Sequence, residues 1–173
     1  MKNLSQIYLF VFCMTGLWGT VQGQNYELSP ESQEAMKPLA FLEGKWKGTG
    51  WMMSRDQQKY EFEQTEEVSF QLSGTHLMIK GQGISDGKVI HHALAMISPT
   101  SQAGDFDFTS FLQSGQKGSF KSELIDGVLY WYPNDQVRYV IRLNDAGQWY
   151  EVGEYNMGEN WFQFFEMTLD KVD

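Results

Sequence analysis

Apolar and polar positions alternate along most of the chain after Gly44, and turn-forming residues interrupt the alternation at short intervals. A period of two predicts half-buried strands, and Asp86-Gly87 and Asp126-Gly127 are strong hairpin signals between consecutive strands. The pattern predicts ten strands, at residues 46–53, 59–72, 76–83, 88–98, 106–113, 118–124, 128–132, 136–143, 148–155 and 160–169.

One stretch near the N-terminus predicts a helix. Ser29 suits the N-cap, Pro30 suits the first helical position, and Pro38 is expected to end the helix. The connections between the strands are too short for Greek-key crossovers, and closing a meander of this length removes its edges. We therefore predict an all-β fold, a closed antiparallel up-and-down β-barrel of about ten strands with one short N-terminal helix.

Residues 1–23 have the features of a signal peptide. A short positive segment precedes an apolar run from Ile7 to Trp18, which is too short for a membrane span of about 20 residues. Val21-Gln22-Gly23 offers compact residues for cleavage, and residues 24–173 are then expected to form a single barrel domain. This interpretation predicts a periplasmic or secreted protein.

The composition excludes several classes of function. Cys13 is the chain's one cysteine and lies in the predicted signal, so the mature protein would have no disulfide and no thiolate. Without Lys2, the mature chain has 12 basic and 22 acidic residues, a net charge of −10. This acidity argues against nucleic-acid partners and against anionic membrane surfaces.

The first predicted strand opens with a motif that resembles a known family. Leu42 to Gly50 reads Leu-Glu-Gly-Lys-Trp-Lys-Gly-Thr-Gly. Gly-x-Trp at this place resembles the lipocalin and calycin group, and Gly-x-Trp-x-Gly-x-Gly is similar to nitrobindin-type barrels and the DUF1579 family of bacterial proteins. The segments 149–155 and 161–169 are similar to the closing hairpin of DUF1579-like chains. The resemblance covers roughly residues 39–171 and implies a lipocalin-like barrel.

The resemblance also implies roles for individual residues. Trp46 would close one end of the barrel, and Lys171 would be the basic residue that stacks on it. Nitrobindin-type proteins bind haem through a histidine near the C-terminus, whereas this chain has no histidine after His92. We therefore expect no cofactor, haem included.

The histidines do not predict a metal site. If Asp86-Gly87 is a two-residue loop, His92 faces Gly81 and His76 faces Ile97, so His76 and His92 lie roughly 17 Å apart. His91 and His92 point to opposite sheet faces, so one of them points inward. The sequence contains no nucleophile elbow and no zinc-protease signature. We therefore assign no catalytic and no metal-binding residues.

The lengths of two loops decide which side chains of the last three strands line the interior. A four-residue loop at 144–147 would place Leu143 opposite Gln148, and a tight turn at Met157-Gly158 would place Asn156 opposite Glu159. The more apolar face of these strands is the expected interior. Its candidate ligand-binding residues are Tyr139, Tyr150, Glu154, Trp161 and Gln163.

That assignment depends on each loop having the expected length. A loop that differs by one residue would exchange the two faces of a strand. Arg138 and Arg142 would then line the cavity, where they would suit a carboxylate ligand.

The expected function is the binding of a small hydrophobic or amphipathic molecule inside the barrel. Three alternatives stay open. One is a small-molecule isomerase or hydrolase-type enzyme that uses Glu154 with Tyr139 or Tyr150. The others are nitrobindin-like haem binding and an exposed aromatic patch that binds a protein partner.

Overall fold

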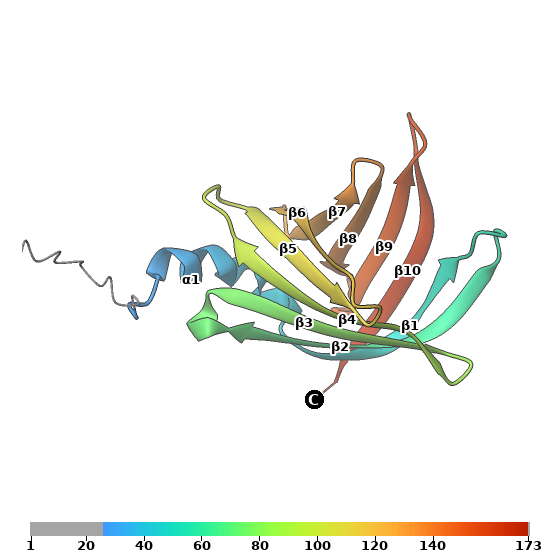
Figure 1. Cartoon of the computed structure of the whole chain (residues 1–173), viewed down its shortest axis with the longest axis horizontal. Coiled ribbons are helices and arrows are strands. Elements are labelled where there is room, and N and C mark those ends of the chain that lie inside the picture. Colours follow the sequence, from blue (N-terminus) through green and yellow to red (C-terminus); the bar gives the residue numbers. More distant parts are fainter. Residues whose placement is uncertain (1–25, 173) are drawn as a thin grey trace, which may run out of the picture.

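The computed structural model describes residues 26–172, which form a closed barrel of ten antiparallel strands (Figure 1). Each strand pairs with the next along the chain, and the last pairs with the first. The predicted all-β, up-and-down barrel with one short helix is confirmed. The predicted signal peptide lies outside the described residues. The strands are β1 (Gly44–Met53), β2 (Lys59–Gln71), β3 (His76–Ser85), β4 (Lys88–Pro99), β5 (Asp105–Leu112), β6 (Lys117–Ile125), β7 (Val128–Asn134), β8 (Val137–Leu143), β9 (Trp149–Asn156) and β10 (Trp161–Val172).

The N-terminal segment covers one end of the barrel. Helix α1 (Pro30–Met36) begins at Ser29, whose hydroxyl accepts a hydrogen bond from the Ser32 N–H at 3.3 Å. The α-helix stops before Pro38, and the chain continues as a 3-10 helix, η1 (Lys37–Leu42). The side chains of Met36, Leu39 and Leu42 are completely buried, so this segment seals the end of the barrel with apolar surface.

The glycines of the Gly-x-Trp-x-Gly-x-Gly motif let β1 approach β10 closely. A Cβ at Gly48 would overlap the backbone of Thr168 and Leu169. A Cβ at Gly50 would lie 2.5 Å from the Glu166 carbonyl oxygen. The motif therefore has a structural reason: side chains at either position would push apart the two strands that close the barrel.

Trp46 lies at the closed end, next to η1. Its indole N–H donates to the Leu42 carbonyl at 2.8 Å, and its ring meets Trp149 edge-on, with centroids 5.9 Å apart. Lys171 is opposite Trp46 in the register, with its Nζ 5.3 Å from the Trp46 ring centroid. This half of the barrel interior is filled by side chains. Its other fully buried apolar residues include Leu77, Ile97, Leu129 and Leu169.

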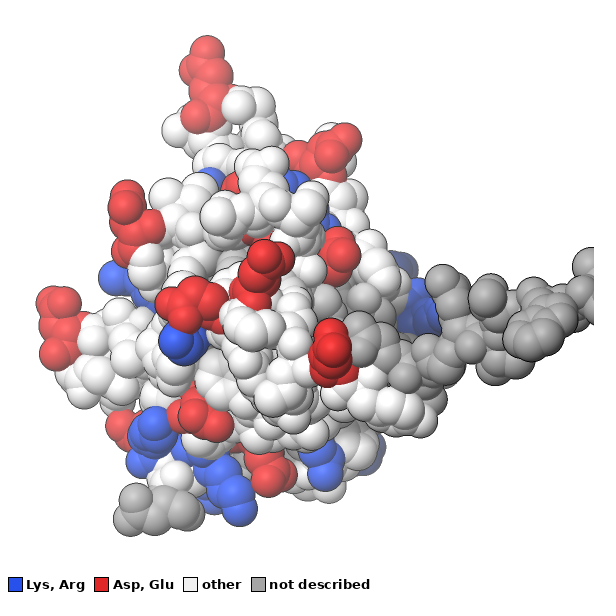
Figure 2. All heavy atoms as spheres, turned by 90° about the vertical axis from the view of Figure 1, so that its left-hand side faces the viewer, with Lys and Arg blue, Asp and Glu red and all other residues white. Residues whose placement is uncertain are grey.

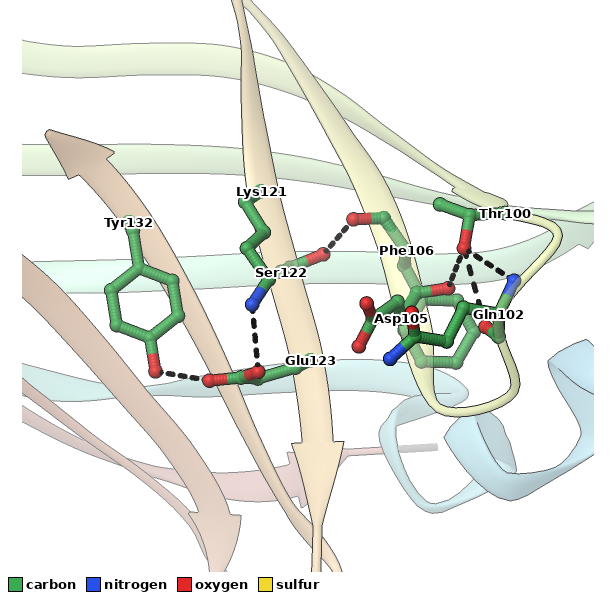
Figure 3. A network of polar contacts seen from close by, with 8 residues as sticks. All are labelled: Thr100, Gln102, Asp105, Phe106, Lys121, Ser122, Glu123 and Tyr132. Atoms are coloured by element: carbon green, nitrogen blue, oxygen red, sulfur yellow. Dashed lines mark hydrogen bonds and ion pairs between the residues drawn. The ribbon is translucent and has the colours of Figure 1, made fainter.

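The turns have the chemistry that their residues predict. In both Asp86-Gly87 and Asp126-Gly127, the aspartate and the glycine have positive φ, as a type I′ hairpin requires. A short 3-10 turn, η2 (Leu72–Gly74), joins β2 to β3. The loop before β5 is held by the Thr100 hydroxyl, which donates to the Asp105 carbonyl and accepts from the Gln102 N–H, both at 3.1 Å (Figure 3).

The molecular surface carries charges of both signs. Figure 2 looks toward the end near α1, where acidic side chains are scattered over the face, its centre included, and basic side chains lie between them. Within residues 26–172, none of the helices has the length and hydropathy needed to cross a membrane.

Candidate functional site

A cavity of about 360 Å³ lies inside the barrel, between the packed closed end and the opposite, open end. Its rim is formed by residues from β1, β4 and β5. These are Met52, Ile90, His91 and Leu112. All four are exposed, Met52 with an exposed fraction of 40%, so the cavity reaches solvent at this end.

Three aromatic rings are stacked along one wall of the cavity. Trp131 of β7 lies between Phe108 of β5 and Tyr139 of β8. Its centroid is 4.6 Å from that of Phe108 and 4.5 Å from that of Tyr139, and both pairs are within 6° of parallel. Phe165 of β10 meets Tyr139 edge-on at 5.6 Å. The stacked rings cover one another's faces, so this wall presents mainly their apolar edges to a ligand.

The deep end of the cavity is polar. Gln64 and Glu66 reach it from β2, and Glu151 reaches it from β9. The Gln64 amide donates to Glu66 Oε1 at 2.6 Å, and the Trp149 indole N–H donates to Glu151 Oε2 at 3.1 Å. Glu66 Oε2 is buried and has no hydrogen-bond partner among the described residues. One acceptor atom at the cavity floor is therefore available to a ligand.

Two glycines of β3 make room for these polar side chains. Gly81 is opposite Glu66 in the register, and Gly83 is opposite Gln64. A Cβ at Gly81 would lie 2.6 Å from Glu66 Oε1, and a Cβ at Gly83 would lie 2.6 Å from the Gln64 amide oxygen. The side chains of β2 thus lie across a strip of β3 that has no side chains of its own.

Burial makes both carboxyl groups weak acids. Desolvation raises the pKa of Glu66 to about 7, against a smaller lowering by the Gln64 hydrogen bond. Desolvation, and then the charge of Glu66, raise the pKa of Glu151 to about 8. Near neutral pH the pair therefore holds one or two protons, and both acidic and carboxylate forms are accessible.

Tyr139 is the one predicted ligand-binding residue that lines the cavity. Its hydroxyl forms no hydrogen bond with the described residues. Burial raises the pKa of this hydroxyl, and the nearby charge of Glu151 raises it further. Tyr139 can therefore donate a hydrogen bond to a ligand throughout the physiological pH range.

The other four predicted residues lie on the outer surface, so their expected placement inside the barrel was wrong. Tyr150 and Gln163 donate to the carboxylate of Glu166, at 2.9 and 2.8 Å. Glu154 accepts from Arg138 at 2.7 Å, and the Arg138 guanidinium is 4.0 Å from the Trp161 ring centroid. On the outer face, the hydrogen-bonding groups of these side chains are therefore paired with neighbouring side chains.

The error has two geometric causes. Leu143 pairs with Trp149 and not with Gln148, because Asn144 bonds across the loop to the backbone N–H groups of Ala146 and Gln148. This register turns Trp149 and Glu151 inward. A β-bulge between Gln163 and Phe165 then shifts the phase of β10. Arg138 and Arg142 remain outside, as in the main prediction.

The predicted pairing of the histidines was also displaced by one residue. A bulge between Gly83 and Ile84 pairs His92 with Gln82 and Leu77 with Ile97. His91 stands at the cavity rim, where partial desolvation and the charge of His92 lower its pKa. In residues 26–172, no cluster of three or more histidine, cysteine, aspartate or glutamate side chains could hold a metal ion.

Sequence reasoning missed Gln64, Glu66 and Glu151 as cavity residues. For β2 a signal was present. Phe62 and Val68 are apolar and share the parity of Gln64 and Glu66, whereas Glu61, Glu63, Thr65 and Glu67 alternate with them. A strand whose apolar positions face inward must turn the intervening residues of the same parity inward too.

A second depression of about 530 Å³ lies outside this cavity, between β1, β2 and the turn after β3. Its lining includes Trp51, Glu63 and Asp86. It holds no buried unpartnered polar atom from the described residues. The interior cavity is therefore the better candidate for a specific binding site.

Comparison with known proteins supports the fold. No family model matches the chain, and no curated protein matches it. Among solved structures, the chain is similar to the one titled "Crystal Structure of Rv2717c from M. tuberculosis", with 15% sequence identity and a TM-score of 0.63. The match covers 85% of this chain and 100% of that chain. At this identity it shows a shared barrel fold, and the resemblance to DUF1579 and the calycins stays a prediction.

Proposed function

We propose that the barrel binds a small, partly hydrophobic molecule in its interior cavity. The supporting observation is the combination of an apolar aromatic wall with a buried polar floor that retains an unpartnered acceptor, Glu66 Oε2. Ligand sites are commonly concave, mostly apolar cavities of about 300–1,000 Å³ with a few polar groups that fix orientation. The cavity volume of about 360 Å³ falls within that range.

The closed end supports the same proposal. Trp46 and Trp149, together with Met36, Leu39 and Leu42 of α1 and η1, are buried at the closed end, so the cavity opens at the opposite rim. A molecule would enter between Met52 and Leu112, lie along the aromatic wall and reach the polar groups last. The proposal requires no cofactor, and the signal-like sequence of residues 1–23 favours a site of action outside the cytoplasm.

The test uses the neutral probe N-phenyl-1-naphthylamine, whose fluorescence rises in apolar surroundings. We expect saturable binding to the mature chain. Ala93→Phe, which projects a ring into the cavity from β4, should weaken binding at least tenfold. The neighbouring Leu94→Phe adds a ring on the opposite face of the same strand and should leave binding within twofold. Equal effects of the two substitutions, with both variants folded by circular dichroism, would contradict the proposal.

A second candidate function is acid–base catalysis in the same cavity. It is favoured by Glu151, whose pKa of about 8 suits proton transfer near neutral pH, and by the adjacent Tyr139. Of the groups expected from the sequence, Glu154 with Tyr139 or Tyr150, only Tyr139 lines the cavity, because Glu154 and Tyr150 lie on the outer surface. A catalytic Glu151 predicts that Glu151→Gln abolishes turnover of a substrate that it still binds.

A further inference from the structure

The polar floor carries information about the class of ligand. Glu66 is 7% exposed, and its Oε2 has no partner among the described residues. A buried acceptor without a hydrogen bond is uncommon in folded proteins and lowers their stability. In its carboxylate form, this oxygen would gain a hydrogen bond from a ligand that donates to it, which favours a hydrogen-bond donor at the deep end.

The carboxyl groups that face the cavity are not balanced by lysine or arginine. Its titratable lining groups are Glu66 of β2, Glu151 of β9, His91 of β4 and Tyr139 of β8, and the lining contains neither lysine nor arginine. Basic side chains near the barrel are engaged elsewhere. Lys171 stacks on Trp46, and Arg138 pairs with Glu154 on the outer face. A cation at the floor would meet two carboxyl groups, whereas an anion would meet no compensating charge.

The aromatic wall suits the remainder of such a ligand. Phe108, Trp131 and Tyr139 form a flat stack between the floor and the rim, and Met52, Ile90 and Leu112 make the entrance apolar. Because the rings cover one another's faces, the wall offers apolar ring edges that suit the apolar part of a ligand. The arrangement thus orients a molecule with its charged end inward and its apolar body toward the rim.

From these observations, and resting on the proposed function, we propose that the cavity binds a small organic cation, an ammonium or amidinium group joined to an apolar body. The charged group lies between Glu66 and Glu151 and donates to Glu66 Oε2. The apolar body lies against Trp131 and Tyr139.

Proton release accompanies this binding. In the unliganded cavity the two carboxyl groups retain protons near neutral pH, because burial raises the pKa of Glu66 to about 7 and that of Glu151 to about 8. A bound cation stabilises the carboxylate forms and expels protons. Binding should therefore tighten as the pH rises from 6 to 8. Desolvation and the charge of His92 lower the pKa of His91 at the rim, so this group opposes a cation less than an ordinary imidazole would.

Three indoles with similar bodies and different charges provide the test: tryptamine, tryptophol and indole-3-propionate. We expect calorimetric titration of the mature chain at pH 7.5 to show tryptamine binding at least tenfold tighter than tryptophol, and indole-3-propionate weakest. Titrations of tryptamine in phosphate and in Tris should differ in apparent enthalpy, because these buffers take up the released proton with different heats. Tryptophol should show no such difference.

Matched variants locate the charged group. Glu66→Gln should weaken tryptamine at least tenfold and leave tryptophol within threefold, and Glu151→Gln should act in the same direction. Glu67→Gln removes the same charge from the adjacent, exposed position and should change neither affinity by more than twofold.

The outcomes separate this inference from the proposed function. If N-phenyl-1-naphthylamine binds and is blocked by Ala93→Phe, but tryptamine binds no tighter than tryptophol or not at all, the cation inference is overturned and the binding function stands. If the naphthylamine probe and all three indoles fail to bind, both proposals are overturned.

Discussion

Carboxyl groups on the two sides of the same barrel wall have opposite environments. On the outer surface, Glu166 accepts hydrogen bonds from Gln163 at 2.8 Å, Tyr150 at 2.9 Å and Trp51 at 3.4 Å. These bonds, that of Gln163 first, lower its pKa. Inside, Glu66 has a single side-chain donor, one oxygen without a partner, and a raised pKa. Both oxygens of the outer carboxylate accept hydrogen bonds, whereas one oxygen of the inner carboxyl group has no partner.

Glu123 is a second outer carboxylate that accepts hydrogen bonds and has a lowered pKa. It accepts from the Tyr132 hydroxyl at 2.6 Å and from Lys121 at 3.0 Å (Figure 3). The Tyr132 bond is the larger cause of its lowered pKa. Satisfied carboxylates are thus the rule where the barrel meets water, and the costly exceptions are confined to the cavity. Polar groups that cost stability in a folded protein often belong to a binding site.

The contrast between inner carboxyl groups with raised pKa values and outer ones with lowered pKa values should have its largest effect on the pH dependence of stability. Raised carboxyl pKa values mean that the folded state binds protons more tightly than the unfolded state, so stability falls as the pH rises from about 4.5 through the folded values. Glu66 and Glu151 titrate at about 7 and about 8. We expect the free energy of unfolding to fall by about 3 kcal/mol between pH 5 and pH 9, less than the full shifts imply because water can enter the cavity.

Urea denaturation at several pH values measures this effect. The double variant Glu66→Gln/Glu151→Gln retains His91 and all surface charges and should lose most of the decline. A wild-type profile that is flat or rises between pH 5 and pH 9 would show that the inner carboxyl groups are as well solvated as the outer ones.

A single substitution should show a smaller effect. Glu66→Gln removes one buried ionisable group, so at pH 9 it should raise the free energy of unfolding by about 2 kcal/mol, and at pH 4 it should have almost no effect. Glu67→Gln is the control, since Glu67 is exposed on the same strand. If both variants respond equally, burial is not the cause.

Removing the hydrogen-bonded outer carboxylate of Glu166 should lower the free energy of unfolding, whereas Glu66→Gln should raise it. Glu166→Ala deprives three donors of their acceptor and should lower the free energy of unfolding by about 1–2 kcal/mol at pH 7. A lowered carboxyl pKa adds stability above the unfolded value of about 4.5 that is lost as the pH falls through the folded value. The difference from wild type should therefore shrink at pH 3. Glu159→Ala, in the exposed turn after β9, should have a negligible effect at either pH.

The fold could be predicted because its signals are local. Period-two alternation and Asp-Gly turns each depend on adjacent residues, and together they gave the number, order and antiparallel pairing of the strands. Ser29 and Pro30 identified the start of α1 for the same reason. A meander needs no long-range information beyond the closure of β1 on β10.

The site was harder to predict because each inward face depends on single-residue offsets. The Asn144 turn and the bulge at Gln163 each shift a strand by one residue, and each such shift exchanges inside for outside. Side-chain bonds and bulges of this kind have no clear mark in the sequence. By contrast, the inward face of β2 follows directly from Phe62 and Val68, and it would have identified Glu66.

Glu154 offers the most direct check on the corrected faces, with the smallest expected effect. Its ion pair with Arg138 is partly exposed, and such pairs contribute about 0–1 kcal/mol. Glu154→Gln should therefore change the free energy of unfolding by less than about 0.5 kcal/mol. It should also leave the binding of N-phenyl-1-naphthylamine and tryptamine within twofold, as measured by the same titrations used for Glu66→Gln. A tenfold loss of binding in Glu154→Gln, with Glu66→Gln unaffected, would return Glu154 to the interior. Because the two residues carry identical groups on opposite sides of the wall, a large effect at Glu66 and a small one at Glu154 would support the inward direction of Glu66 and the outward direction of Glu154.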